Sequence, residues 1–402
     1  MQLVENRSPQ RNRPLTAAER SIVGTSAPDE VRRYLPAFPT YRETPLVTLP
    51  NLATQFGLGG IAVKDEGQRY GLYSFKALGG AYAVARLVGN HVRKVLGREI
   101  EPGELLGEES RSIARNLTVC CATDGNHGRS VAAGAQRFGC RCVIFLHSGV
   151  SAGREAAIRA FGAEIRRTAG NYDQSVDEAS ATADREGWIT VSDFSWAGYS
   201  EIPGMVMQGY TIMLDEIMRQ STARYSHVFV QGGVGGLAAV VGGYLLDRFK
   251  DERPSLVIVE PSRANCLQVS AGGNQRTAIA PGEGTLMAML ECYEPSLVAW
   301  DILEKSADFY LDVSDEQALV ALKQLARPLA GDPPLTIGES GAAGLAGLMA
   351  AATDTAIRTK LALDHRSNVL LFGTEGATDP DLYAKLLDWD GPVPSVSHGG
   401  VS

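Results

Sequence analysis

The pattern of hydrophobic and polar positions along the 402-residue chain predicts an α/β protein. Short apolar runs typical of buried strands alternate with stretches whose apolar residues recur every three to four positions, as they do in amphipathic helices. Such alternation is typical of parallel sheets covered by helices. The alternation falls into two series, and each series predicts one sheet.

The first series lies in the N-terminal half of the chain. A glycine-bounded turn is expected at 125–128, followed by a helix that runs to Phe138 and stops at Gly139. Further helices are expected at 153–161 and 173–185. The predicted strands are 117–122, 141–147, 164–168 and 188–191. Together these units predict one self-contained parallel layer.

The second series predicts helices at 203–219 and 237–250, and strands at 227–231, 256–260 and 368–372. Residues 262–301 are less regular, and we expect them to form a surface that faces the substrate. The first ~35 residues are rich in Arg, Pro and Ser, and they are expected to form a loosely packed arm. The fold class is therefore predicted as α/β, with two open parallel-sheet domains and helices on both faces.

Composition places the chain among soluble globular proteins, with 44% hydrophobic and 21% charged residues. A net charge of −8 argues against a nucleic-acid partner, which favours clustered Lys and Arg. No apolar stretch reaches the ~20 residues of a membrane helix, and the first 20 residues lack a secretory signal.

We expect a cytoplasmic protein with buried structural thiols. Cys266 and Cys292 could pair, but a cytosolic setting argues against it. The scattered histidines predict no metal site.

Lys76 is the first candidate for chemistry. It follows Ser74, which can cap the next helix, expected at 77–87. The first turn of a helix is electropositive, so we expect this position to favour the neutral, nucleophilic form of the lysine. Taken alone, the residue fits a surface lysine better.

A glycine-rich loop at 231–237 lies between a predicted strand and a predicted helix. Its amides and the helix N-terminus could close on a phosphate. The same letters also fit a dinucleotide-binding fingerprint, with Glu260 near the place of a ribose-binding acid. The loop therefore indicates a phosphate and leaves the cofactor open.

Two further polar loops follow strands. Residues 123–128 read T-D-G-N-H-G, where Asn126 offers both donor and acceptor groups to a cofactor ring and Asp124 is an acid in an unusual place. Residues 191–199 supply Asp193 beside large aromatic side chains. Because ligands bind at the carboxyl ends of parallel strands, both loops are candidate site segments.

The order of these motifs resembles that of the fold type II pyridoxal 5′-phosphate (PLP) enzymes, such as serine and threonine dehydratases, tryptophan synthase β and cysteine synthase. The match runs from Thr44 to Asp379. On this resemblance PLP is the cofactor, Lys76 holds it in a Schiff base, and Asn126 faces its phenolic oxygen. The resemblance assigns the phosphate to Gly232, Gly233, Val234, Gly235 and Gly236.

The chain looks closest to the diaminopropionate ammonia-lyases, through residues 123–129, 192–199, 207–210 and 285–292. Ordinary dehydratases typically have serine where this chain has Asp124. A substrate with a β-ammonium in place of a hydroxyl needs such a carboxylate, and Asp193 would be a second one. The substrate-binding residues implied by the resemblance are Ser74, Thr123, Asp124, Gly125, His127, Asp193 and Thr285.

The implied reaction is the α,β-elimination of D- or L-2,3-diaminopropionate to pyruvate and two ammonia. Lys76 would remove the Cα proton on one face and Asp124 on the other, with Asp193 as a further catalytic acid. One departure is Gly373, where several relatives have a serine against the ring nitrogen. Thr374 is the nearest substitute, but its direction from the backbone differs.

The resemblance also implies a homodimer that acts on a small amino acid, without a nucleic-acid or membrane partner. It divides the chain into a large PLP-binding domain, residues 1–78 and 197–402, and an inserted small domain, residues 79–196, that contributes the Asn126 turn and the acids. Two alternatives stay open: a serine or threonine dehydratase on the same scaffold, and an NAD(P)-dependent oxidoreductase built on the glycine loop with Glu260.

Overall fold

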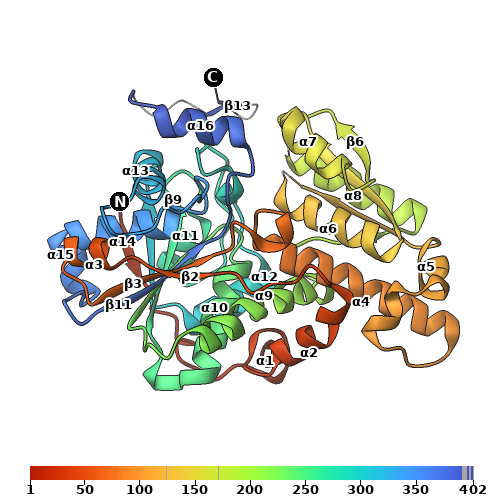
Figure 1. The fold of residues 1–402 in the computed structure, drawn as a ribbon, viewed down its shortest axis with the longest axis horizontal. Helices are drawn as coiled ribbons and strands as arrows, with labels where there is room; N and C mark the ends of the chain where they lie inside the picture. Colours follow the sequence, from red (N-terminus) through yellow and green to blue (C-terminus); the bar gives the residue numbers. More distant parts are fainter. Residues whose placement is uncertain (124, 171, 392–395, 398–399, 402) are drawn as a thin grey trace.

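Two separate sheets organise the chain, as the two series of strands predicted (Figure 1). The computed structural model describes residues 1–123, 125–170, 172–391, 396–397 and 400–401. A short antiparallel ribbon of β12 (Val396–Ser397) and β13 (Gly400–Val401) lies near the C-terminus. The α/β class predicted from the sequence is confirmed.

The larger sheet has seven strands. Its two edge strands are antiparallel to their neighbours, and the five between them are parallel to one another. In spatial order the strands are β1 (Leu3–Glu5), β10 (Phe309–Val313), β9 (Ser255–Pro261), β8 (His227–Gln231), β11 (Asn368–Gly373), β3 (Gly60–Asp65) and β2 (Leu46–Thr48).

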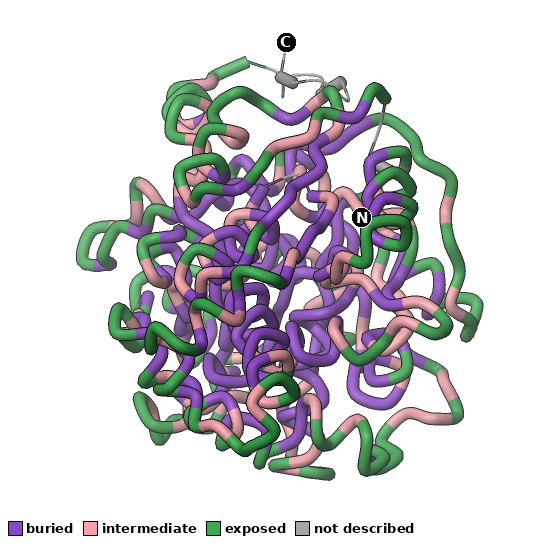
Figure 2. The backbone as a smooth tube through the Cα atoms, turned by 90° about the vertical axis from the view of Figure 1, so that its right-hand side faces the viewer, coloured by how far each residue is buried: buried purple, intermediate pink, exposed green. Residues whose placement is uncertain are grey.

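Helices cover both faces of this sheet, which follows from the alternation of side chains along a strand. In β8, Val228 and Val230 pack in one core cluster with α10 (Gly236–Phe249), whereas Phe229 packs in another cluster with α14 (Ala343–Thr353). Figure 2 shows that the buried parts of the chain gather in the interior and the exposed parts lie around them.

The smaller sheet has four strands, all parallel, and contains the first predicted series. Its spatial order is β6 (Glu164–Thr168), β5 (Arg141–His147), β4 (Thr118–Ala122) and β7 (Ile189–Thr190). The helices between its strands are α6 (Asn126–Phe138), α7 (Ala152–Arg159) and α8 (Tyr172–Glu186), and they lie with β6 on the right of Figure 1. The strands predicted at 141–147 and 164–168 are confirmed to the residue.

One long helix, α4 (Lys76–Leu96), lies between the two sheets and packs against both α6 and α9 (Glu201–Gln220). The close approach depends on glycine, because a Cβ at Gly134 would lie 2.9 Å from the Cα of Ala81. The predicted end of this helix at residue 87 is wrong. The apolar face continues, with Val92 buried, until Gly97 adopts the left-handed conformation that ends the helix.

The expected loose N-terminal arm is also wrong. β1 joins the large sheet, and α1 (Ala17–Val23) and α2 (Ala27–Tyr34) pack on the core. Thr16 and Glu19 form a capping box that starts α1, and Val31 on α2 is 3% exposed. A few well-spaced apolar residues were enough to bury this segment despite its Arg and Pro content.

The remaining helices connect and cover the sheets. They are α3 (Pro50–Gln55), α5 (Glu108–Ala114), α11 (Cys266–Gly273), α12 (Leu297–Ser306), α13 (Asp315–Ala326), α15 (Thr355–Lys360) and α16 (Pro380–Asp388). The segment 262–301, expected to be irregular, contains α11 and the start of α12, and only residues 274–296 between them are largely irregular. In the described part of the chain no helix combines the length and the apolar character that crossing a membrane requires.

Candidate active site

A cavity of about 520 Å³ lies where the carboxyl ends of β4, β8 and β11 meet. The loops that follow these strands supply its walls, as expected for parallel sheets. The start of α4, the residues after β7 and the irregular segment before α12 complete it. Lining residues that carry the argument below are Ser74, Lys76, Thr123, Gly125, Asn126, His127, Asp193, Tyr210, Gln231, Gly232, Gly233, Val234, Gly236, Thr374 and Glu375.

Lys76 begins α4, and its ammonium forms an ion pair with the Asp193 carboxylate. Ser74 accepts a hydrogen bond from the Lys76 backbone N–H at 3.3 Å, although it is not the residue that directly precedes the helix. Burial disfavours the ammonium, but Asp193, followed by Tyr210, outweighs burial and raises the pKa of Lys76 above its ordinary value. The expectation that the helix end would favour the neutral amine is therefore wrong, because a tertiary contact dominates.

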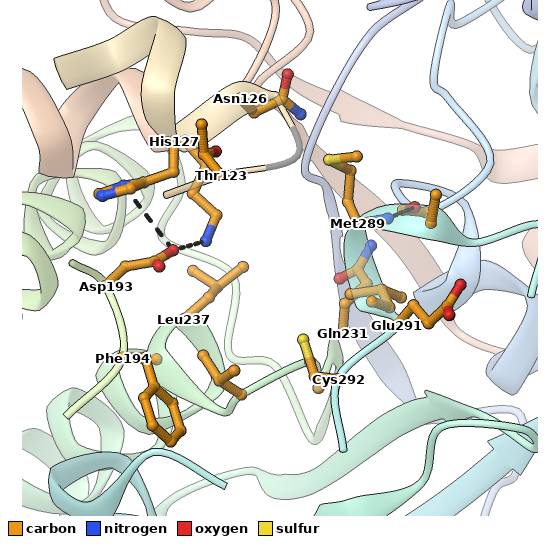
Figure 3. Close-up of a pocket in the computed structure, with 18 of the residues that line it drawn as sticks. Thr123, Asn126, His127, Asp193, Phe194, Gln231, Leu237, Met289, Glu291 and Cys292 are labelled. Atoms are coloured by element: carbon orange, nitrogen blue, oxygen red, sulfur yellow. Dashed lines mark hydrogen bonds and ion pairs between the residues drawn. The ribbon is translucent and has the colours of Figure 1, made fainter. Parts of the chain in front are cut away.

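Asp193 lies between two cationic or potentially cationic groups. Its carboxylate is 3.9 Å from Nδ1 of His127, which Figure 3 marks with a dashed line. Burial acts against the charged carboxylate, but His127 and Lys76 together hold the pKa of Asp193 well below its ordinary value. Nε2 of His127 lies 2.8 Å from the carbonyl oxygen of Val191, which it can meet only as a donor. Asp193 is therefore an ionised carboxylate that faces the cavity.

The glycine loop runs from the end of β8 into α10. Gly233 and Gly235 have φ of +62° and +99°, which L side chains rarely adopt. A Cβ at Gly235 would also lie 3.1 Å from Leu303. Gly235 does not line the cavity, but it shapes the turn that presents its neighbours there. Backbone amides at a helix N-terminus form a ready anion site.

Glu260 does not support the dinucleotide interpretation of this loop. Its carboxylate accepts hydrogen bonds from the backbone amides of Leu267 and Gln268, at 2.9 and 2.8 Å. Burial raises its pKa to about 8 against the opposing effect of these two bonds. Because Glu260 is fully buried and lies outside the cavity lining, it is not placed to bind a ribose.

Asn126 has a partner that sequence reasoning missed. Its Nδ2 donates to Oε2 of Glu375 at 2.6 Å, and Oε1 of Glu375 is buried without a partner in the described structure. Burial, followed by the nearby carboxyl of Glu339, raises the pKa of Glu375 to about 8. The position of Glu375 in the polar loop after the last strand was its only signal in the sequence.

Gly373 ends β11 without a side chain that could reach a ligand. A Cβ there would lie 3.0 Å from Cγ1 of Ile337, so this isoleucine fills the space that a serine would need. Thr374 lines the cavity, and its backbone oxygen accepts from the amide of Phe75 at 3.0 Å. The start of α4 and the end of β11 are thereby held together.

Two predicted site residues that the structure describes, Gly235 and Thr285, do not line the cavity. Thr285 is buried, donates to the Asp315 carboxylate and accepts from the amide of Met287 at 3.2 Å. Its place suggests support for the segment at 288–294 that lines the cavity. Asp124 lies outside the described residues, so its role stays a prediction. Cys266 is a buried free thiol and forms no disulfide with Cys292, which lines the cavity.

The residues present fit PLP. The cavity contains a primary amine at Lys76, an anion-binding glycine loop at 232–236 and a side-chain amide at Asn126. Gln231 adds a buried Oε1 without a partner in the described chain, while its Nε2 donates to two backbone carbonyls. Within the described residues, no cluster of three or more His, Cys, Asp or Glu could hold a metal ion.

Comparisons with known proteins show which families and structures resemble this chain. A family model described as "Pyridoxal-phosphate dependent enzyme" matches residues 37–366. Diaminopropionate ammonia-lyase of Salmonella typhimurium is 35% identical over 387 residues, covering 94% of this chain and 95% of that protein. The Escherichia coli enzyme of that name is 38% identical over 358 residues, covering 87% and 88%.

Solved structures extend the similarity to three dimensions. The E. coli diaminopropionate ammonia-lyase in complex with an aminoacrylate-PLP azomethine reaction intermediate has a TM-score of 0.86 at 35% identity, covering 96% of both chains. A threonine deaminase from Solanum lycopersicum has a TM-score of 0.69 at 20% identity, which shows a shared fold alone.

Proposed function

This chain belongs to the family of pyridoxal-phosphate dependent enzymes, and from that membership we propose that it converts 2,3-diaminopropionate to pyruvate and two molecules of ammonia. The reaction is an α,β-elimination that consumes one water molecule. The observation that carries the proposal is the ionised Asp193 carboxylate in the cavity with Lys76 and the glycine loop. A carboxylate there suits a substrate with a β-ammonium.

Three groups would hold the cofactor. Lys76 would bind its aldehyde carbon, Asn126 its phenolic oxygen, and the loop at 232–236 its phosphate. When bound, PLP withdraws the electron pair left at the substrate Cα after the proton has gone. Glu375 orients the Asn126 amide through their 2.6 Å hydrogen bond. Thr374 is the residue that we propose to lie beside the ring nitrogen of PLP.

Proton transfer falls to this chain's own residues. The Lys76 amine, once free, removes the proton from Cα on one face, and Asp124 is proposed for the other face. Asp193 accepts hydrogen bonds from the Lys76 ammonium and from the β-ammonium of the substrate. It thereby keeps the β-nitrogen protonated, and that nitrogen leaves as neutral ammonia when the C–N bond breaks.

Further features are proposals from the same resemblance. They are a homodimer, a cytoplasmic location, a role in amino-acid catabolism and an inserted small domain at 79–196. The small domain is supported by the four-stranded sheet, whose strands all fall between residues 118 and 190.

The test is pyruvate release from D- and L-2,3-diaminopropionate, compared with D- and L-serine. We expect both diaminopropionate enantiomers to react faster than either serine enantiomer. The purified protein should absorb at about 410–430 nm, and K76A should lose that band, since the absorbing bond includes the Lys76 nitrogen. D124N should lose diaminopropionate turnover while it retains serine turnover.

Faster turnover of serine or threonine would instead assign the dehydratase activity. A colourless protein that binds NAD would overturn the PLP-based proposal altogether. D177N is the control for D124N, because it makes the same chemical change at an exposed aspartate that lines the cavity. Its turnover should stay at the level of the unmodified chain.

A further inference from the structure

Tyr210 is a cavity-lining residue without a role in the reaction as described so far. It lies on α9 and is 1% exposed. Its hydroxyl has no hydrogen-bond partner in the described structure. A buried hydroxyl without a partner is costly, so one at an active cavity indicates that a partner is met during function.

The phenol ring is held in place by its neighbours. A Cβ at Gly79 would lie 2.8 Å from Cζ of Tyr210, so the ring occupies space that only a glycine leaves open on α4. Phe75 packs on the other side, with ring centroids 4.7 Å apart. These contacts fix the direction of the hydroxyl next to the first turn of α4, where Lys76 lies.

Lys76 and Asp193 are the charged groups whose fields act on this phenol. Burial raises the pKa of Tyr210 far above its ordinary value, Lys76 lowers it and Asp193 raises it. Tyr210 in turn contributes to the raised pKa of Lys76. The phenol is therefore neutral at working pH, and it lines the same cavity as the lysine amine.

The lysine needs different partners in its two protonation states. A carboxylate can only accept hydrogen bonds, so Asp193 serves the ammonium. The neutral amine must be present to remove a proton. Its lone pair accepts a hydrogen bond, so this form of the lysine needs a donor. A hydroxyl can donate to the neutral amine and accept from the ammonium without changing its own charge.

We propose that Tyr210 is a positioning residue whose hydroxyl donates a hydrogen bond to the neutral Lys76 amine and orients it for proton transfer at the substrate Cα. The inference rests on the proposed function only for the identity of the substrate. No net proton is transferred to or from the phenol.

The test is Y210F in the holoenzyme, which removes the hydroxyl and keeps the ring that fills the space at Gly79. Tyr310 gives a matched control, because its hydroxyl is also buried without a partner in the described structure but lies outside the cavity lining. Alanine is the probe, since it has no β-leaving group. Exchange of the Cα proton with deuterated water, followed by NMR for D- and L-alanine separately, reports proton transfer without elimination, and Lys76 is the proposed base for one of the two enantiomers.

We expect Y210F to slow this exchange about tenfold or more for one alanine enantiomer and to change its pH midpoint, because a hydrogen-bond donor to the neutral amine is lost. The kcat for diaminopropionate should fall in parallel, with KM within about twofold. The visible band of Y210F should shift, and Y310F should match the unmodified chain in every measurement.

Exchange at the unmodified rate and pH midpoint in Y210F would overturn the inference, whatever the band shows. An equal loss in Y310F would also overturn it, because the effect would then be structural. If the unmodified chain exchanges alanine but releases no pyruvate from diaminopropionate, the proposed function fails, and the comparison of Y210F with Y310F still decides the role of Tyr210.

Discussion

Replacing Asp193 with asparagine should change two steps in opposite directions. In the folded chain Lys76 is an ammonium paired with the Asp193 carboxylate, and this pair raises the pKa of Lys76 despite burial. D193N keeps the shape of the side chain and removes its charge. The remaining burial then favours the neutral amine, so the pKa of Lys76 should fall.

The size of the effect follows from the type of contact. A hydrogen bond between charged partners is worth about 1.5–3 kcal/mol, and about 1.4 kcal/mol changes a protonation equilibrium tenfold. The fraction of neutral Lys76 at a given pH should therefore rise about 10- to 100-fold. Because only the neutral amine attacks an aldehyde, the cofactor-depleted chain should combine with PLP faster by a similar factor.

Elimination should change the other way, because D193N no longer pairs with a β-ammonium. The assays are stopped-flow absorbance at about 410–430 nm after mixing with PLP, and pyruvate release from diaminopropionate. D177N is the control, since Asp177 lines the same cavity but is exposed, so solvent screens its charge. Slower or unchanged reaction with PLP in D193N would refute the reasoning, as would elimination at the unmodified rate.

Three further changes test other parts of the structure. Folding raises the pKa of Glu375 from 4.5 to about 8, so between these pH values the folded chain keeps a proton that the unfolded chain loses. The stability of the folded chain should therefore fall as pH rises from about 4.5 to about 8. Tm measured against pH should show this fall, and E375Q should show less of it. E216Q removes a charge that pairs with the fully buried Lys64 and Arg69. Urea unfolding should show that the free energy of unfolding falls by about 3–5 kcal/mol. The control R224A, which breaks an exposed ion pair, should show no measurable change. G235A places a side chain beside Leu303 at a residue whose φ is +99°. The substitution should lower Tm and speed the loss of the PLP absorption band on dialysis. A band that is lost no faster than in the unmodified chain would contradict the phosphate role of the loop.

The parts of the site that could be predicted are those that a pattern of neighbouring residues indicates. Glycines at 232–236 and at 125–128 mark turns between a strand and a helix, and strand ends of a parallel sheet meet at one edge. Asp193 was identified because it follows a predicted strand, and Lys76 because it follows Ser74 at the start of a predicted helix. The end of α6 followed from Gly139, whereas the stop at Gly97, which ends α4, was overlooked.

The parts that could not be predicted depend on contacts between distant segments. Asn126 and Glu375 are 249 positions apart, and no local pattern relates them. The protonation of Lys76 was predicted with the wrong sign, since the helix end was visible in the sequence and the contact with Asp193 was not. Tyr210 fell within a segment that carried the resemblance, 207–210, but it was given no role, because a tyrosine on an apolar helix face is an ordinary core residue until its hydroxyl is found without a partner.

Both sheets supply residues to the cavity, and α4 lies between them. The glycine loop and Thr374 follow strands of the large sheet, whereas Asn126, His127 and Asp193 follow strands of the small sheet. Lys76 stands at the first residue of α4, which packs against α6 of the small sheet and α9 beside the large one. Lys76 and its acidic partner are therefore carried by different elements, α4 and the segment after β7. The packing of α4 on α6, where Gly134 lets the helices approach at Ala81, holds the first of these elements against the small sheet that carries the second.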